Sequence, residues 1–517
     1  MTRATNPAPA SGVYDVVVVG GGVNGAGIAR DAAGRDLSVL LVEQDDLASH
    51  TSSASTKLIH GGLRYLEFYD FGLVRKALQE REVLLALAPH IVWPLRFVMP
   101  HDRHLRPAWM IRAGLFLYDH LARRQRLAAS RTIDLRTHPA GPPLEAQYRV
   151  GFEYADAWVD DSRLVVLNAI DAREHGATIL TRTRCVAAHR TTDHWYVTLR
   201  NTATNTGVAT ETTVSARALV NATGPWVNRF LGETARQPTP RRVRLVKGSH
   251  IVVPQLFSHR YAYIFQTTDQ RIVFAIPYEG RFTLIGTTDI EFNGDPGAVS
   301  IDAAERAYLL EMANRYFARD LHDPDIVWSY SGVRPLLDED AAEKASSVTR
   351  DYTLELDAQG AALLSIYGGK ITTFRRLAEE AVDRLAAALG SAAGPWTAHA
   401  PLPGGDMPNA DFEEFRRSFN RRHPWVPERL ATRYARAYGT RAARVLGHAG
   451  SARDLGDEVL PDLYVAEIDY LRREEWAMSA EDLLLRRTKL ALHVPDGGIE
   501  RLAAWLAAHP LATERAA

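Results

Sequence analysis

The sequence predicts an α/β fold class. Taken together with a separate antiparallel sheet and a helical region, the whole chain is predicted to be α+β. Three features lead to this fold class. The first 45 residues carry a strand, helix and strand pattern, residues from about 240 to 355 are rich in β-branched and aromatic side chains, and residues from about 410 to 517 read as helical and rich in arginine and alanine. We therefore expect a Rossmann-type domain interleaved with an antiparallel sheet and followed by a helical domain.

The length of the chain fits this division. At 517 residues and 57.4 kDa the chain exceeds a single ordinary core. A linker containing proline and glycine, "GSAAGPWTAHAPLPGGDMPNADF", precedes the helical region. The predicted parts are 1–12 as a disordered N-terminal tail, 13–395 as the two interleaved domains, and 396–517 as the C-terminal helical domain.

The first unit has the pattern of a dinucleotide-binding βαβ motif. A β-branched run over 16–19 predicts a strand, 24–33 a helix and 38–42 a second strand. The glycine fingerprint G-x-G-x-x-G places the first glycine in a tight turn, the second against a pyrophosphate and the third between helix and strand. Its glycines are Gly20, Gly22 and Gly25. The pyrophosphate is expected at the unpaired N–H groups that begin the helix, beside Asn24.

Glu43 ends the second predicted strand. Its carboxylate is placed to accept hydrogen bonds from ribose hydroxyls, and it would repel a 2′-phosphate, which argues against NADP. A glycine-rich turn with a purely structural role is the alternative interpretation.

The run "TSSASTKLIHGGLRYLE", residues 51–67, favours FAD over NAD. A nicotinamide enzyme would normally continue from Glu43 with alternating strands and helices, whereas here a loop rich in hydroxyls and glycine follows. Thr51 and Ser52 are expected to bind pyrophosphate and ribityl oxygens, and Lys57, Leu58 and Ile59 to run along the flavin ring. The alternative is a solvated, serine-rich turn.

Four side chains are candidates for catalysis. His60 is a candidate base, because histidine can take a hydroxyl proton near neutral pH. Arg64 and Arg334 are candidate phosphate clamps, since guanidinium groups bind phosphate oxygens bidentately. Lys370, in "YGGKITT", is expected to stabilise negative charge on the flavin together with the helix that follows. The rival interpretations are a buried core histidine, structural ion pairs, and a neutral Lys370 as the proton acceptor.

Lysine is rare in this chain, which draws attention to its positions. Only six of the 61 basic residues are lysines, and three of them stand beside glycine or in a hydroxyl-rich loop. These three are Lys57, Lys247 and Lys370. We interpret them as candidates for sites that need a compact ammonium.

Later segments are assigned to the same fold. An amphipathic helix is predicted from about Asp161 to His175, and a helix capped near Thr372 or Thr373 follows Lys370. The A-T-G turn after the strand 218–221 is expected to return beside the dinucleotide. Further cofactor contacts are predicted at Val186, Gly224, Gly332 and Thr372.

Composition excludes several classes of function. A formal charge of −1 and a pI near 7.0 give no field that would collect nucleic acid. The single cysteine, Cys185, excludes intrachain disulfides and cysteine-rich metal sites, and no metal ion is predicted. The N-terminus lacks the apolar core of a signal peptide, and no apolar run is long enough to span a bilayer.

Residues 101–126 are the candidate for contact with a membrane surface. The segment combines bulky apolar side chains with six arginines against two aspartates. This composition suits a helix that lies in the interface of an anionic bilayer. A core helix with a basic end is the alternative.

Several motifs together resemble the FAD-dependent, respiratory glycerol-3-phosphate dehydrogenases. They are "DVVVVGGGVNGAGIARDAAGR", "TSSASTKLIHGGLRYLE", "LRPAWMIRAGLFLYDHL", "GFEYADAWVDDSRL", "LVNATGPWV", "KGSHIVVP", "IGTTDIE", "SGVRPL" and "YGGKITTFRRLAE". The resemblance runs from about residue 13 into the C-terminal helical region and is strongest to the bacterial aerobic enzymes.

The resemblance implies a glutathione-reductase-like FAD domain interleaved with a substrate-binding sheet. It implies oxidation of sn-glycerol 3-phosphate to dihydroxyacetone phosphate, with hydride transfer to flavin N5 and electrons passed to membrane ubiquinone or menaquinone. It matches His60, Arg64, Arg334 and Lys370 to functional positions and adds Tyr65 as a substrate contact. We expect a cytoplasmic homodimer attached to the inner face of the membrane, without the calcium regulation of mitochondrial relatives.

Two other functions stay open at this point. A flavin oxidase of the same fold would give its electrons to oxygen, or would act on an amino or hydroxy acid. An RNA-binding flavoprotein would use the arginine-rich C-terminal region, but that region mixes in many carboxylates and lacks interleaved aromatic residues.

Overall fold

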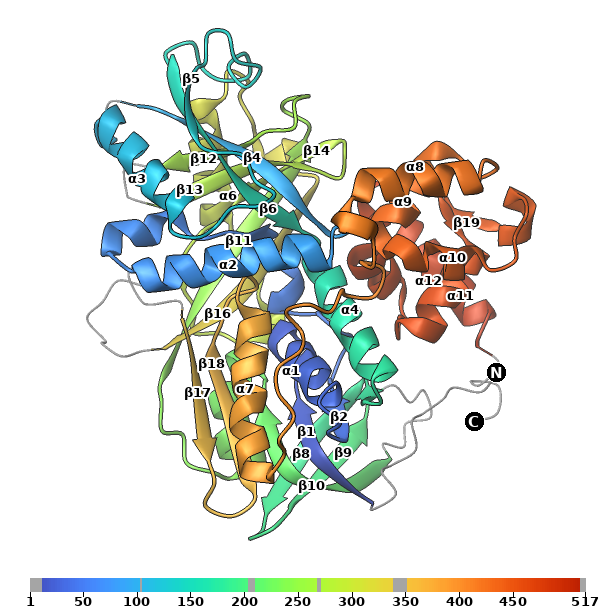
Figure 1. Cartoon of the computed structure of the whole chain (residues 1–517). Coiled ribbons are helices and arrows are strands. Elements are labelled where there is room, and N and C mark those ends of the chain that lie inside the picture. The colour runs from blue at the N-terminus through green and yellow to red at the C-terminus, as the bar shows by residue number, and fades with distance from the viewer. Residues whose placement is uncertain (1–11, 103–104, 203–209, 267–270, 338–350, 512–517) are drawn as a thin grey trace.

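Two large sheets and a helical domain make up the molecule. The structure is a computed structural model and describes residues 12–102, 105–202, 210–266, 271–337 and 351–511. In Figure 1 the first sheet lies below the second, and the helical domain lies beside them. The predicted tail at 1–12 lies outside the described residues, apart from Gly12.

The first sheet contains eight strands among the described residues, five of which form a parallel core. Its path is β17 (Tyr352–Asp357), β18 (Ala362–Gly368), β10 (Glu211–Asn221), β1 (Val13–Val19), β2 (Val39–Val42) and β7 (Thr178–Leu180), and β9 (Trp195–Asn201) pairs with β10 and with β8 (Thr183–Arg190). The central strands are continuous runs of valine and leucine because both faces of the sheet are covered.

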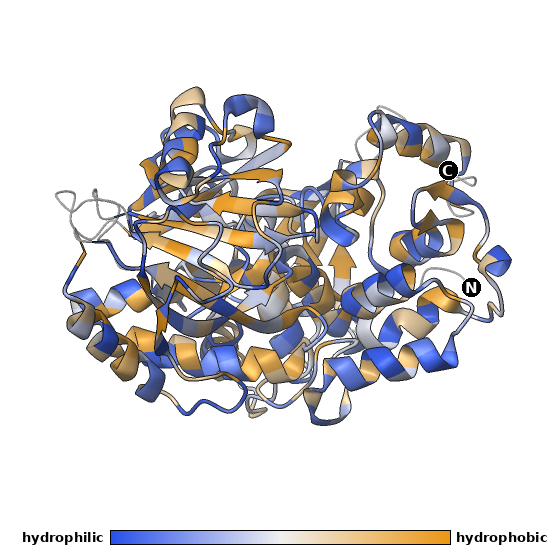
Figure 2. Ribbon diagram, turned by 90° about the horizontal axis from the view of Figure 1, so that it is seen from above, coloured by the Kyte–Doolittle hydropathy of each residue, from blue (hydrophilic) through white to orange (hydrophobic). Residues whose placement is uncertain are grey.

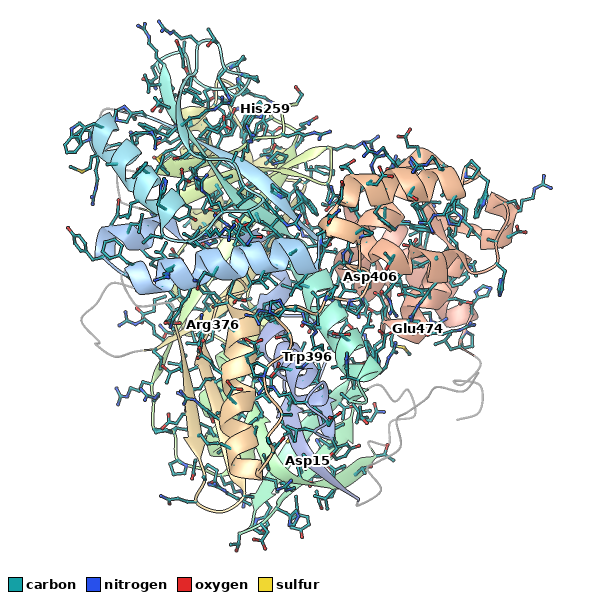
Figure 3. The ribbon with its side chains drawn as sticks, in the orientation of Figure 1. Asp15, His259, Arg376, Trp396, Asp406 and Glu474 are labelled. Carbon is teal, nitrogen blue, oxygen red and sulfur yellow. The ribbon has the colours of Figure 1, made fainter. Side chains whose placement is uncertain are left out.

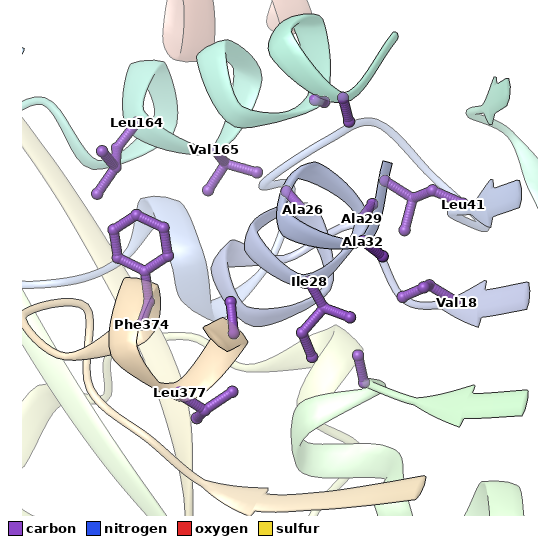
Figure 4. Close-up of a cluster of buried hydrophobic side chains, with 14 of the residues drawn as sticks. Val18, Ala26, Ile28, Ala29, Ala32, Leu41, Leu164, Val165, Phe374 and Leu377 are labelled. Atoms are coloured by element: carbon purple, nitrogen blue, oxygen red, sulfur yellow. The ribbon is translucent and has the colours of Figure 1, made fainter. Parts of the chain in front are cut away.

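Three helices cover one face of this sheet. Helix α1 (Val23–Ala33) packs between α4 (Asp161–Glu174) and α7 (Phe374–Leu389), and Figure 4 shows their apolar side chains meeting. Close packing requires Gly27, where a Cβ atom would lie 2.9 Å from the ring of Phe374. Alternate residues of β1 face the opposite cluster, which holds Trp195.

The second sheet contains ten strands in the described part of the chain. Its path is β15 (Ile290–Glu291), β11 (Val243–Pro254), β14 (Phe282–Gly286), β13 (Ile272–Tyr278), β12 (Ala262–Gln266), β4 (Val92–Pro100), β6 (Val150–Val159) and β3 (Leu58–Ile59), with β16 (Trp328–Leu337) on β11 and β5 (Arg131–Asp134) on β6. Figure 2 shows that hydrophobic residues prevail in the central strands.

The predicted combination of a Rossmann-type domain with a second, interleaved sheet is confirmed. The sheet is mixed, however, because β12 pairs in parallel with β4. It also recruits four strands from the first third of the chain, whereas β17, which falls at the end of the predicted antiparallel region, joins the first sheet. Helices α2 (Phe71–Leu87), α3 (Ala108–His120) and α6 (Ala303–Tyr316) accompany the second sheet.

The prediction that α4 is amphipathic is wrong. Every residue from Asp161 to Ala172 is buried. One side of the helix packs on α1, and the other side meets the C-terminal domain, where the guanidinium of Arg163 pairs with Glu475. Near the end of the helix Arg173 pairs with Glu474 at 2.8 Å, at the junction marked in Figure 3.

The C-terminal domain is helical, as predicted. It contains α8 (Phe412–Arg422), α9 (Glu428–Tyr438), α10 (Ala442–Leu446), α11 (Val465–Glu474), α12 (Gly498–Ala508) and the short pair β19 (Glu458–Leu460) and β20 (Leu463–Tyr464). Its own apolar cluster begins at Phe419. The preceding linker packs on the first domain instead: Trp396 donates a hydrogen bond from its indole to the carbonyl of Asp31 at 3.1 Å (Figure 3).

Candidate active site

A cavity of about 870 Å³ lies where the two sheets meet. Its walls come from the turn between β1 and α1, the end of β2, the chain from 43 to 58, the A-T-G turn, β16, and the glycine turn before α7. The carboxyl ends of β1 and β2 therefore open into it, which is where α/β sheets bind their ligands.

The three fingerprint glycines have different tasks. Gly20 has φ +111°, and a Cβ atom there would lie 2.5 Å from the carbonyl oxygen of Ala222. Gly22 lines the cavity, whereas Gly25 does not, since a Cβ atom on Gly25 would meet the carbonyl oxygen of Gly20 at 1.9 Å. Gly25 thus brings helix and strand together, and only the first two glycines face a ligand.

The beginning of α1 is an anion-binding position. The N–H group of Val23 donates to the hydroxyl of Ser52 at 3.0 Å, so Ser52 is held against the helix terminus. Asn24 donates from its amide to the carbonyl of Gly368 at 3.3 Å and ties the helix to the glycine turn. Both side chains line the cavity.

Glu43 lies at the end of β2, as predicted, and lines the cavity. Its carboxylate accepts hydrogen bonds from the N–H groups of Gly21 at 2.6 Å and Asp45 at 3.0 Å. Burial raises the pKa of this carboxyl. Glu43, Asp45 and His50 have ligand atoms within 4.8 Å of one another, but they stand where the ribose is expected, so we assign them to the cofactor.

The loop after Glu43 is only partly arranged as predicted. Thr51, Ser52 and Leu58 line the cavity, and the hydroxyl of Thr51 donates to the carbonyl of Val333 at 2.8 Å. Ile59 does not line it, because Leu58 and Ile59 are consecutive residues of β3 and face opposite sides of the strand.

Lys57 is the clearest departure from the predicted site. Its ammonium pairs with Asp161 at 2.8 Å and donates to the carbonyl of Ser53 at 2.9 Å, with the side chain 2% exposed. It does not line the large cavity. Lys247 is likewise held in ion pairs, with Glu305 at 2.7 Å, so of the three singled-out lysines Lys370 alone borders the site.

His60, Tyr65 and Lys370 all line the cavity. The ammonium of Lys370 lies 4.0 Å from the centre of the Tyr65 ring. The backbone N–H of His60 donates to the hydroxyl of Thr372 at 3.2 Å. Thr372 thus lines the cavity beside His60. The next residue, Thr373, takes the N-cap position of α7 without a side-chain hydrogen bond.

Arg334 lines the same cavity from β16. Its guanidinium pairs with Asp289 and donates to the hydroxyl of Thr287 at 3.3 Å. It lies over Gly248, where a Cβ atom would come within 2.7 Å of one guanidinium nitrogen. Thr287 and Asp289 belong to the motif "IGTTDIE", but no role was predicted for either residue from the sequence.

Besides Gly25, Lys57 and Ile59, two further predicted residues lie outside the walls of the cavity. Arg64 is half-buried in the short 3₁₀ helix η2 (Leu63–Phe68). At the position predicted for Val186, the neighbouring residue Cys185 lines the cavity instead, because β8 has a register irregularity between Cys185 and Ala187. Gly224 and Gly332 line the cavity as predicted, and a Cβ atom on Gly332 would lie 2.9 Å from Ala54.

Comparison with known proteins fits this geometry. The family described as FAD dependent oxidoreductase matches residues 15–375, and the family described as C-terminal domain of alpha-glycerophosphate oxidase matches residues 395–508. The chain is 54% identical over 514 residues to the glycerol-3-phosphate dehydrogenase of Pseudomonas aeruginosa, which covers 99% of this chain and 98% of that protein. The chain belongs to the FAD-dependent glycerol-3-phosphate dehydrogenase family.

Other members of this glycerol-3-phosphate dehydrogenase family and its relatives extend the comparison. The D-erythritol 1-phosphate dehydrogenase of Brucella abortus is 51% identical, covering 95% of this chain and 97% of that protein. The solved glycerol-3-phosphate dehydrogenase of Bacillus halodurans complexed with FAD has a TM-score of 0.78 and 28% identity, covering 96% of this chain and 90% of that one. The resemblance stated from the motifs is therefore confirmed.

The residues present fit FAD, the cofactor of this family. Gly20 and Gly22 allow the backbone to approach a pyrophosphate at the start of α1. Glu43 offers a carboxylate to a ribose, and Thr51 and Ser52 offer hydroxyls along the same wall. His60 and Lys370, the candidates for the reactive end of the cofactor, line the same cavity.

Proposed function

We propose that this protein oxidises sn-glycerol 3-phosphate to dihydroxyacetone phosphate. One observation carries the proposal: a guanidinium, an imidazole and an ammonium line the same cavity as the dinucleotide fingerprint. They belong to Arg334, His60 and Lys370. A phosphorylated polyol needs a cation for its phosphate and a base for its hydroxyl, and this cavity supplies both.

Each side chain then has one task. Arg334, positioned by Asp289 and Thr287, places its guanidinium charge at the substrate phosphate. His60 accepts the proton of the C2 hydroxyl. When bound, FAD supplies the acceptor for the C2 hydride. Lys370, over the Tyr65 ring, places positive charge beside the reacting end. Arg64 is proposed as a second cation for the phosphate, although it does not line the cavity.

We further propose that the electrons pass to a membrane quinone, with the protein lying on the membrane surface. Helix α3 carries the support for this step. Trp109 and Phe116 are 70% and 57% exposed, and they stand seven residues apart with Met110 and Leu117 beside them, so they share one face. Tyr69, 78% exposed, directly follows the neighbouring 3₁₀ helix η2. Exposed aromatic and aliphatic side chains in this number are what an interfacial helix inserts into lipid.

The orientation toward the inner face of the membrane and a homodimer remain predictions. Among the described residues no helix is both long and apolar enough to cross a membrane. The apolar face of α3 is accompanied by Arg106 and Arg112, which suit contact with anionic lipid head groups.

The absorbance of the purified flavoprotein tests the proposed reaction. Anaerobic addition of sn-glycerol 3-phosphate should bleach the oxidised flavin band, and a ubiquinone analogue should restore it. D-erythritol 1-phosphate, the substrate named for a relative, should act more slowly. Absence of bleaching with glycerol 3-phosphate would refute the assignment. Rapid peroxide formation without activity toward the quinone analogue would instead support the oxidase.

A further inference from the structure

The chain from Glu43 to Lys57, here called the cofactor loop, forms a continuous wall of the FAD cavity. Most of its residues line the cavity, including Asp45, His50 and Thr51. It has little regular structure, only the short 3₁₀ helix η1 (Thr51–Ser53). Something outside the loop must therefore hold it in place.

The C-terminal domain holds the first end of the cofactor loop. Asp46 is 2% exposed and does not line the FAD cavity. Its carboxylate accepts two hydrogen bonds from the guanidinium of Arg487, both at 2.7 Å, and a third from Arg486 at 2.7 Å. Both arginines belong to η10 (Asp482–Arg487), more than 400 residues later in the chain.

A second attachment reinforces this end. The N–H group of Arg182 donates to the carbonyl of Asp45 at 2.8 Å. The guanidinium of Arg182 pairs with Asp482, which also pairs with Arg486 at 2.5 Å. Charges of opposite sign therefore alternate across the junction, and they are mostly buried.

The far end of the loop is held by a buried carboxylate of α4, which lies beside a lysine of the C-terminal domain. Lys57 pairs with Asp161 at 2.8 Å, and the hydroxyl of Ser55 donates to the same carboxylate at 2.7 Å. Lys489, two residues past the end of η10, lies 3.9 Å from Asp161 and donates to the hydroxyl of Ser162 at 2.7 Å.

The middle of the loop is not packed against the C-terminal domain. A cavity of about 240 Å³ separates residues 49–54 from Leu484, Leu485 and Leu492. The loop is thus joined to the C-terminal domain by ionic contacts near its ends, whereas Thr51 and Ser52 in its middle are held by hydrogen bonds with Val333 and Val23.

We propose that Arg486 and Arg487 are positioning residues for FAD, through which the C-terminal domain sets the affinity for the cofactor. They hold Asp46, and so keep the cofactor loop in the shape that accepts the dinucleotide. A loop that is already ordered loses less conformational entropy when its ligand binds, which gives tighter binding. The inference concerns cofactor retention and does not depend on the substrate assigned above.

The test measures release of FAD from diluted holoenzyme by the rise in flavin fluorescence. Arg487→Met should raise the FAD dissociation constant about tenfold or more, since it leaves a buried carboxylate with one partner fewer. Arg486→Met should have a smaller effect. The matched control is Arg421→Met in the same domain, which removes an exposed pair with Glu414 and should leave the constant unchanged.

A double variant separates cofactor affinity from simple loss of folding. In Asp46→Asn with Arg487→Met both buried charges are gone, so the melting temperature of the cofactor-free protein should recover toward that of the wild type. FAD should nevertheless remain weakly bound. If Arg487→Met does not fold, the double variant and Arg486→Met decide the question. A dissociation constant within twofold of the wild type in the folded variants would overturn the proposal.

Discussion

The ammonium of Lys370 lies 4.0 Å from the centre of the Tyr65 ring. The two residues line the FAD cavity from different elements, one from the glycine turn before α7 and the other from η2. A cation above an aromatic face is attracted by the negative potential of the ring. The ring therefore helps to fix the ammonium beside the reacting end of the cofactor.

Replacing Tyr65 tests this relationship. Tyr65→Leu should lower kcat/KM for glycerol 3-phosphate about tenfold, because the lost attraction is of order 1 kcal/mol or more in a desolvated site. Tyr65→Phe keeps the ring and should retain most of the activity. Steady-state kinetics with a soluble quinone as electron acceptor would measure kcat/KM for both variants. Equal losses in both variants would assign the effect to the phenolic hydroxyl instead.

Arg334→Lys should raise KM more than it lowers kcat. An ammonium cannot contact Asp289 and a phosphate with the geometry of a guanidinium fork, so phosphate binding should weaken about tenfold to a hundredfold. The same kinetic assay provides the measurement. Arg306→Lys, which alters an exposed pair with Asp323, is the control and should change neither constant. An unchanged KM would remove Arg334 from the phosphate site.

His60→Asn tests the proton acceptor. The rate of anaerobic flavin reduction by glycerol 3-phosphate should fall about 100-fold to 10,000-fold, the usual contribution of a general base. The FAD content should stay the same. His189→Asn, an exposed position on β8, serves as the control. Near-normal reduction of the His60 variant would transfer the role to Lys370.

The exposed face of α3 should carry membrane binding. Trp109→Ser combined with Phe116→Ser removes two large apolar side chains that contribute little to the core, so the melting temperature should barely change. Partition onto anionic vesicles should fall about tenfold or more, given the apolar surface lost. Co-sedimentation measures it. Tyr196→Ser, an exposed aromatic residue on the first sheet, should have no effect.

His90 should make the protein acid-sensitive. Its side chain is fully buried beside Arg163 and Arg436, and burial lowers the pKa of the imidazole to about 3. The unfolded chain takes up this proton near pH 6.5 while the folded chain does not. The stabilisation is therefore complete above pH 6.5 and is lost as the pH falls toward 3.

The wild type should lose about 2 kcal/mol of unfolding free energy from this residue between pH 8 and pH 5. His90→Gln cannot titrate and should lose correspondingly less over the same range. Urea unfolding at the two pH values compares them. Parallel losses in both proteins would show that other groups govern the acid sensitivity.

The sequence was most informative where function depends on the local backbone. Gly20 and Glu43 were predicted from the spacing of one βαβ unit, since the turn, the helix terminus and the strand end are near one another in the chain. His60 and Lys370 were found because their neighbours are unusual. Ile59 could have been excluded from the predicted flavin contacts, because consecutive residues of a strand, here Leu58 and Ile59, face opposite sides.

Long-range pairing was not visible in the sequence. Nothing near Lys57 indicated that Asp161 would neutralise it, and "IGTTDIE" gave no sign that Asp289 would hold Arg334. These pairs join strands and helices distant in the chain. The full burial of α4 has the same origin, since its second covering face is supplied by the last domain.

That covering face has a consequence for the order of events during synthesis. The parallel sheet receives its central partner β10 (Glu211–Asn221) only from the middle of the chain, and the outer β18 only after more than 360 residues have been made. Asp46 and α4 receive their charged partners from residues 475–487, close to the end of the described chain. Such non-local contacts form slowly. The nascent N-terminal domain therefore leaves the ribosome with buried-type surface still uncovered, and it completes its fold only when the last helices emerge.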